Sequence, residues 1–115
     1  MKENQDSLLK KEYYASLLLI YGRLLTENIY HRMELYYLMD YSITEISECD
    51  KVSRNAVFEA LDQGCRKLDG YETKLRLYQK NRELTSALEN ILSTEDASEK
   101  DRLLRKLKGE IENGI

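Results

Sequence analysis

The sequence contains no proline and only five glycines among its 115 residues. Because these two residue types are the usual interruptions of helices, their scarcity favours long, uninterrupted helices. Histidine occurs once and cysteine twice, as Cys49 and Cys65. Two isolated thiols and one imidazole provide no metal-ligand spacing, and such thiols are typical of a reduced cytoplasmic protein. The sequence therefore predicts neither a metal site nor a cofactor.

Long apolar runs are absent as well. No stretch approaches the roughly 20 apolar residues of a membrane span. The first residues, MKENQDSLLKKEYY, lack the basic, then apolar, then small-residue order of a secretory signal. We therefore expect a cytoplasmic protein without membrane insertion. We expect no enzyme either, because the sequence shows no nucleophile–base pair and no glycine-rich phosphate loop.

The charges that are present are unevenly distributed along the chain. The net charge is −3, whereas a nucleic-acid-binding domain is commonly basic. Residues 40–63 carry six acidic and two basic side chains, and residues 64–82 carry two acidic and six basic ones. An acidic segment is thus followed by a basic one. The first would repel a polyanion and the second would attract it.

The stretch from Ser42 to Leu68 has the pattern of two helices joined by a tight turn, a helix-turn-helix. Ser42 and Glu45 have the capping-box spacing at the start of the first helix, and Ser53 is the N-cap candidate of the second. Apolar residues at helical spacing give each helix a buried face, with a valine in the turn between them: Ile43, Ile46, Cys49, Val52, Val57, Leu61 and Leu68.

The rest of the chain also reads as helix. We expect helices from Ser7 to Tyr21, from Thr26 to Asp40 as support for the helix-turn-helix, and without a strong stop from Ser53 to Leu92. A last helix is expected after an Asp96 cap, up to Asn113. The prediction is one all-α domain over residues 1–115, with a core at 26–68 and a long-helix and C-terminal extension at 69–115.

Leucines and tyrosines recur at seven-residue steps along the expected long helix, for example Leu61, Leu68 and Leu75. Two interpretations remain open. The stripe either packs on the N-terminal helix of the same chain or forms a self-association seam. From the second interpretation we predict a homodimer that forms through the long or the N-terminal helix.

Three segments together resemble the YlxM-like family of bacterial proteins: LTENIYHRMELYYLMDYSITEIS, VSRNAVF and KLDGYETKLRLY. Their layout also resembles the last DNA-binding region of bacterial sigma factors. The resemblance implies a wingless, sigma-like helix-turn-helix followed by a long helix. It also implies a place in, or regulation of, the signal recognition particle pathway, because such proteins are encoded beside the gene for the particle's GTPase.

The sequence departs from the family pattern at two places. Lys51 stands where the family has a turn glycine, at a position that often needs a left-handed backbone. About ten residues after the turn serine, where the family often has basic residues, this chain reads Leu61-Asp62-Gln63. The second departure puts DNA reading by this helix in doubt.

The nucleic-acid-binding candidates cluster at the start of the second helix. Arginine forms bidentate hydrogen bonds with guanine and asparagine with adenine, and a helix N-terminus binds phosphate. The candidates are Lys51, Ser53, Arg54, Asn55 and Arg66. On the same face, Glu59 and Asp62 would oppose a polyanion. The alternative is therefore a helix-turn-helix reused as a scaffold or a protein-docking surface.

A second set of candidates is the basic run that follows the helix-turn-helix. It comprises Lys67, Lys74, Arg76, Lys80 and Arg82, with tyrosines between them. Such a helix suits contact with signal recognition particle RNA or protein, or it is simply a solvated face. Two functions stay open: a DNA-binding regulator, or an interaction protein of the signal recognition particle that does not bind DNA.

Overall fold

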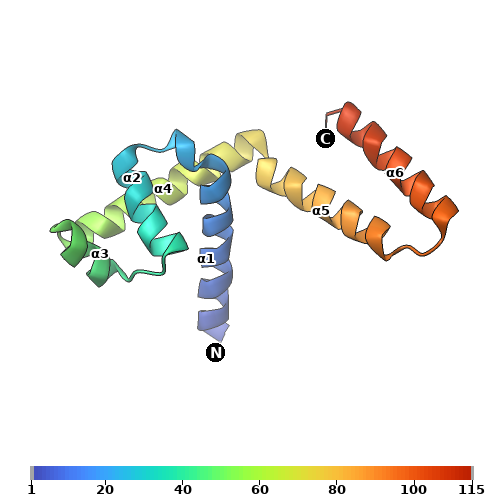
Figure 1. Cartoon of the computed structure of the whole chain (residues 1–115). Coiled ribbons are helices and arrows are strands. Elements are labelled where there is room, and N and C mark those ends of the chain that lie inside the picture. The colour runs from blue at the N-terminus through green and yellow to red at the C-terminus, as the bar shows by residue number, and fades with distance from the viewer. Residues whose placement is uncertain (1, 115) are drawn as a thin grey trace. The chain divides into compact units, whose positions relative to one another are not determined.

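The protein is all-α over residues 2–114, the part of the chain that the computed structural model describes; its side chains are described from residue 8 (Figure 1). The predicted fold class is thereby confirmed. No helix in this part is long and apolar enough to cross a membrane. The elements are α1 (Lys2–Tyr21), the short 3₁₀ segment η1 (Gly22–Leu24), α2 (Glu27–Met33), the π-helical segment η2 (Glu34–Leu38), α3 (Ile43–Asp50), α4 (Arg54–Leu75), α5 (Leu77–Ser93) and α6 (Ala97–Glu112).

The chain divides into two compact units, Met1–Arg76 and Leu77–Ile115. The first unit holds α1 to α4, and the second holds α5 and α6. We had placed the end of the helix-turn-helix core at Leu68, but α4 continues to Leu75. The expectation that residues 1–115 act as one domain stays a prediction.

The predicted uninterrupted helix from Ser53 to Leu92 is wrong. Arg76 adopts a left-handed backbone (φ 55°, ψ 31°) that ends α4, and its N–H donates to the carbonyl oxygen of Glu72. Leu68 is the last buried residue of α4, and Tyr71 and Glu72 still contact Tyr21 of α1 about one turn before the break. Neither glycine nor proline marks the break. The seven-residue stripe is therefore not one seam, since Leu68 is buried whereas Leu75 is 47% exposed.

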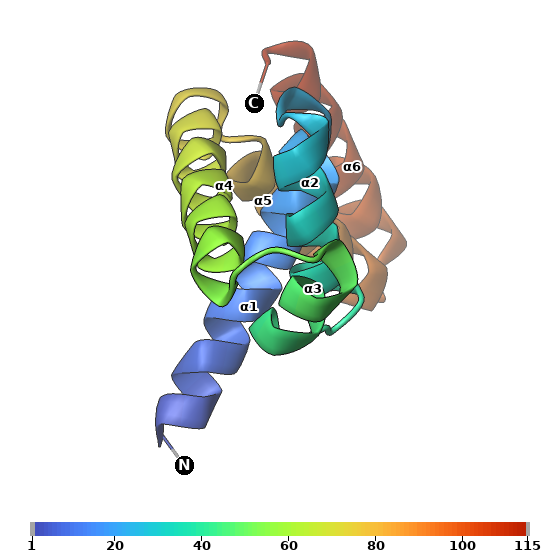
Figure 2. The same cartoon turned by 90° about the vertical axis from the view of Figure 1, so that its left-hand side faces the viewer.

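In the first unit, α4 lies beside α1, α2 and α3 (Figure 2). The fully buried side chains come from all four helices: Leu17, Leu18, Tyr21, Met33, Ile46, Val57 and Leu68. The predicted apolar faces are confirmed at these positions. Cys49, which was expected on the buried face of α3, is exposed instead.

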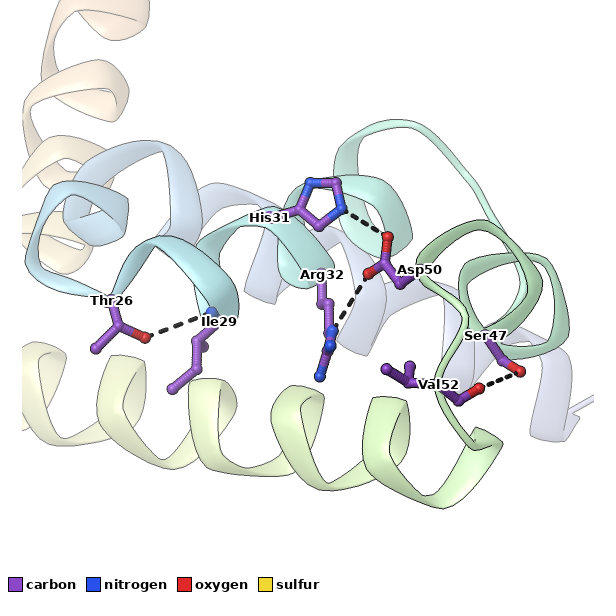
Figure 3. Close-up of polar contacts among 7 residues, drawn as sticks. All are labelled: Thr26, Ile29, His31, Arg32, Ser47, Asp50 and Val52. Carbon is purple, nitrogen blue, oxygen red and sulfur yellow. Dashed lines mark hydrogen bonds and ion pairs between the residues drawn. The ribbon is translucent and has the colours of Figure 1, made fainter.

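The support helix predicted from Thr26 to Asp40 consists of two pieces. Thr26 caps α2 as expected, its hydroxyl oxygen accepting from the Ile29 N–H at 3.4 Å (Figure 3). After Met33 the helix widens into η2, and the Met39 N–H reaches back to the Glu34 carbonyl at 3.0 Å. Such π-turns add a residue to a helical turn. Here the widened turn precedes Asp40, which itself has a left-handed backbone (φ 63°).

The second unit is a hairpin of α5 and α6 (Figure 1). Asp96 begins α6 as predicted, because its carboxylate accepts from the N–H groups of Ser98 and Glu99 at 2.9 and 3.4 Å. Ile91 of α5 and Leu107 of α6 are buried between the two helices.

Gly64 marks a close approach of α4 to α2. A Cβ added there would lie 2.6 Å from Met33 Sδ and 3.0 Å from Ile29 Cγ2. Met33 is fully buried. Any side chain at position 64 would therefore push α2 away from α4.

We expect Gly64→Ala to lower the free energy of unfolding by about 1–3 kcal/mol, because the added methyl overpacks this contact. Gly70→Ala is the matched control, since no atom lies within 4 Å of its Cβ position. That control should instead be stabilised by about 0.5–1 kcal/mol through its helix propensity. Urea unfolding followed by circular dichroism measures both variants. Equal changes of the same sign would contradict the close approach.

Candidate nucleic-acid interface

The first helix of the helix-turn-helix, α3, starts at a complete capping box. The Ser42 hydroxyl accepts from the Glu45 N–H at 3.0 Å, and the Glu45 carboxylate accepts from the Ser42 N–H at 2.9 Å. The backbone hydrogen bond from Ser42 lowers the pKa of Glu45. The capping box predicted from the S-x-x-E spacing is confirmed, and it fixes where α3 begins.

The turn between α3 and α4 is held by backbone geometry and one side chain. Lys51 has a left-handed backbone (φ 57°, ψ 45°), as its place at the family's glycine position suggested. The Ser47 hydroxyl donates to the Val52 carbonyl oxygen at 2.9 Å (Figure 3). Val52 is half-buried between the helices, consistent with its predicted role in the gap.

The helix-turn-helix is tied to α2 by an ion-pair cluster centred on Asp50, the last residue of α3. Figure 3 shows His31 and Arg32 of α2 directed at this carboxylate. His31 Nε2 lies 3.0 Å from Oδ1 and Arg32 Nε lies 3.3 Å from Oδ2. The side chains of Arg32 and Asp50 are only 12% and 15% exposed. The hydrogen bond from His31, followed by that from Arg32, lowers the pKa of Asp50.

The sequence did not indicate the role of Asp50. His31 lies on the exposed side of α2. Its partner is 19 residues further along the chain, so no local spacing relates the two. Asp50 can be recognised as the partner of His31 and Arg32 only when the packing of α3 against α2 is known.

The second helix, α4, begins at Ser53, as predicted. The Ser53 hydroxyl accepts from the Ala56 N–H at 3.0 Å. Lys51, Ser53, Arg54 and Asn55 are all exposed and lie together around this N-terminus. Arg66 is exposed too, but it is three turns further along α4. Four of the five predicted residues are therefore grouped, and Arg66 is separate from them.

Acidic neighbours on α4 hold two of the predicted nucleic-acid contacts. The Asn55 amide donates to Glu59 at 3.3 Å. Arg66 forms an ion pair with Asp62 at 3.0 Å. Both pairs are exposed and span one helical turn, so each is weak and easily broken. Their carboxylates add negative charge to the exposed face of α4.

The basic run is divided between the two units. Lys67 and Lys74 belong to α4, Arg76 is the residue at which α4 ends, and Lys80 and Arg82 belong to α5. The five basic residues therefore do not lie on the one long helix that the sequence had predicted. In the first unit only Lys67 and Lys74, seven residues apart, share one side of α4.

A pocket of about 280 Å³ lies beside α4 and was not foreseen from the sequence. Its apolar walls include Phe58, which is 57% exposed, and Leu61. At its base the Tyr37 hydroxyl lies 3.2 Å from Cys65 Sγ, and burial raises the pKa of both groups. The Cys65 thiol therefore stays protonated at neutral pH and is a poor nucleophile. In the described part of the chain, no three acidic, histidine or cysteine side chains are grouped as metal ligands.

The chain matches a family model over residues 8–108, described as "Putative helix-turn-helix protein, YlxM / p13 like" and designated UPF0122. A UPF0122 protein of Caldanaerobacter subterraneus subsp. tengcongensis is 44% identical over 71 residues, which is 62% of this chain and 61% of the relative. One of Staphylococcus epidermidis is 38% identical over 92 residues, 77% of this chain and 84% of the relative. The match to the first relative thus spans less than two thirds of its length.

We expect Asp50→Asn to lower the free energy of unfolding by about 1–2 kcal/mol, because Arg32 loses a charged partner in a largely buried position. Since the pKa of Asp50 is lowered in the folded state, this stabilisation is present above its ordinary value of 3.8 and is lost as the pH falls through the lowered value. Asp40→Asn is the control, because the Asp40–Lys11 pair is exposed. Urea unfolding between pH 7 and pH 2 tests both; indistinguishable variants would contradict this role of Asp50.

Lys51→Gly should raise the free energy of unfolding by about 0.5–1 kcal/mol, because glycine adopts the left-handed backbone without a Cβ penalty. Glu48→Gly, at an exposed position within α3, is the matched control and should lower it by about 1 kcal/mol. Thermal unfolding measures both. Destabilisation by Lys51→Gly would contradict this expectation. It would show that the lysine side chain stabilises the turn by more free energy than its left-handed backbone costs.

Proposed function

We propose that this chain, which belongs to the UPF0122 family of YlxM/p13-like helix-turn-helix proteins, is a cytoplasmic regulatory protein that binds nucleic acid through the start of α4. The observation that carries the proposal is the exposed group of Lys51, Arg54 and Asn55 around the Ser53-capped N-terminus. The family resemblance connects this regulation with the signal recognition particle pathway. Its nucleic-acid target is accordingly DNA of the operon that encodes the particle's GTPase.

Contact with a duplex would take place in three steps. The N-terminus of α4 and Lys51 meet phosphates first, since both present positive potential. Arg54 and Asn55 then face base edges, as the first residues of a recognition helix do. To reach adenine, Asn55 exchanges its weak hydrogen bond to Glu59 for a bidentate one.

The acidic residues on α4 make this binding weak and selective. Glu59 and Asp62 repel any phosphate backbone, so non-specific affinity is low. Only a site whose base contacts offset that repulsion would be held. A regulator built in this way would ignore most of the chromosome without needing high affinity for its own site.

A second candidate function is binding of signal recognition particle RNA. Lys67 and Lys74 favour it, because they share a side of α4 and belong to the basic segment. Two lysines on one helix suit phosphate contacts with an RNA helix and carry no sequence specificity. In this case the start of α4 would serve only the fold.

We expect wild-type protein to shift operon DNA in a gel, more strongly at low salt, and Arg54→Ala/Asn55→Ala to weaken binding at least about tenfold. Arg105→Ala/Asn90→Ala removes the same residue types from exposed positions of the second unit and should have no effect. Glu59→Gln/Asp62→Asn should bind more tightly, since both repelling charges are gone. No shift by wild-type protein even at low salt would contradict DNA binding.

The same gels with the particle's RNA separate the two candidates. RNA binding that survives Arg54→Ala/Asn55→Ala but is lost in Lys67→Glu/Lys74→Glu would favour the second function. Lys106→Glu/Lys108→Glu is its control, because these exposed lysines of α6 carry equal charge outside the basic run.

A further inference from the structure

The hairpin of α5 and α6 leaves most of its large apolar side chains exposed. Ile91 and Leu107 are its buried apolar residues in the described part of the chain, at 6% and 7% exposure. Leu84 and Leu103 are half-buried. Five further large apolar side chains are between 42% and 77% exposed: Leu77, Leu88, Leu92, Leu104 and Ile111. Units of fewer than about 40 residues seldom hold a stable core without a metal, a disulfide or oligomerisation. This unit, Leu77–Ile115, contains no cysteine.

The exposed apolar residues of both helices lie on the same face of the hairpin. On α5, Leu88 and Leu92 follow the half-buried Ala87 and the buried Ile91 by one residue, a rotation of about 100°. On α6, Leu104 follows the half-buried Leu103 in the same way. The two helices run antiparallel (Figure 1). A rotation of the same sense away from the buried face therefore brings the exposed residues of both helices to the same side of the hairpin. Ile111, four residues after the buried Leu107, is turned to the same side. We call this surface, formed by Leu88, Leu92, Leu104 and Ile111, the hairpin face.

We propose that the hairpin face binds the hairpin face of a second copy of this chain, so that α5 and α6 of the two copies form a four-helix bundle. Two helices with a shared apolar face are half of such a bundle. A face that must be covered for its unit to be stable needs a partner that is always present, and a second copy meets that requirement.

The charge of the unit agrees with self-association. Residues 77–115 carry seven basic and eight acidic side chains, so two copies do not repel each other. Two of the charged pairs are internal to α6, Arg102 with Glu99 and Arg105 with Asp101. The hairpin face itself consists of leucine and isoleucine. The dimer does not depend on the proposed function, because α4 lies in the other unit.

Light scattering coupled to size-exclusion chromatography tests the proposal on the full chain. At high micromolar concentration, wild-type protein should have twice the monomer mass, and Leu92→Glu/Leu104→Glu should have the monomer mass. Leu19→Glu is the matched control, since Leu19 of α1 is 74% exposed and lies on the N-terminal helix through which a dimer was also expected. This control should stay dimeric.

Hydrogen exchange on the wild-type protein provides a second measurement in case the double variant does not fold. Dilution should weaken the protection of α5 and α6 amides and leave α2 to α4 unchanged. A wild-type monomer at high micromolar concentration would overturn the proposal. Protection of the α5 and α6 amides that does not change on dilution would not rescue it, because a stable monomeric hairpin would give the same result. A dimer that Leu19→Glu abolishes and Leu92→Glu/Leu104→Glu retains would overturn it as well.

Discussion

The close approach of α2 to α4 is the constraint on which the helix-turn-helix depends. With no side chain at Gly64, Met33 packs directly against the backbone of α4. Helix α2 also holds α3, because its His31 and Arg32 bind Asp50, the last residue of α3. The angle between α3 and α4 is thus set by contacts on the inner side of both helices, aided by the left-handed Lys51 in the turn.

This arrangement leaves the outer face of α4 free to vary. Asn55, Glu59, Asp62 and Arg66 take no part in the core, so their charges change what α4 binds without changing the fold. That freedom explains how a helix-turn-helix coexists with acidic residues on the outer face of α4. Function in this family therefore has to be argued from the outer face of each member and not from the fold that they share.

Local signals in the sequence predicted the starts of the helices, and distant contacts decided what the sequence did not predict. Ser42, Ser53 and Asp96 were correctly identified as caps, because a cap acts on residues two or three positions away. The break at Arg76 has no local signal, since neither glycine nor proline stands there and the last buried residue of α4, Leu68, lies about two turns earlier. The role of Asp50 and the exposure of Phe58 likewise depend on how separate helices pack. Arg66 is separate from the four predicted contacts around the start of α4 because it lies three turns further along the same helix.

The salt dependence of DNA binding most directly tests the proposed interface at the start of α4. Lys51 and Arg54 are the only basic residues in 40–63, so together with the N-terminus of α4 they suffice for about two to four phosphate contacts. The logarithm of the binding constant should then fall against the logarithm of salt concentration with a slope of about −2 to −4. A slope near about −8, typical of a basic DNA-binding surface, or no measurable binding at the lowest salt would contradict it.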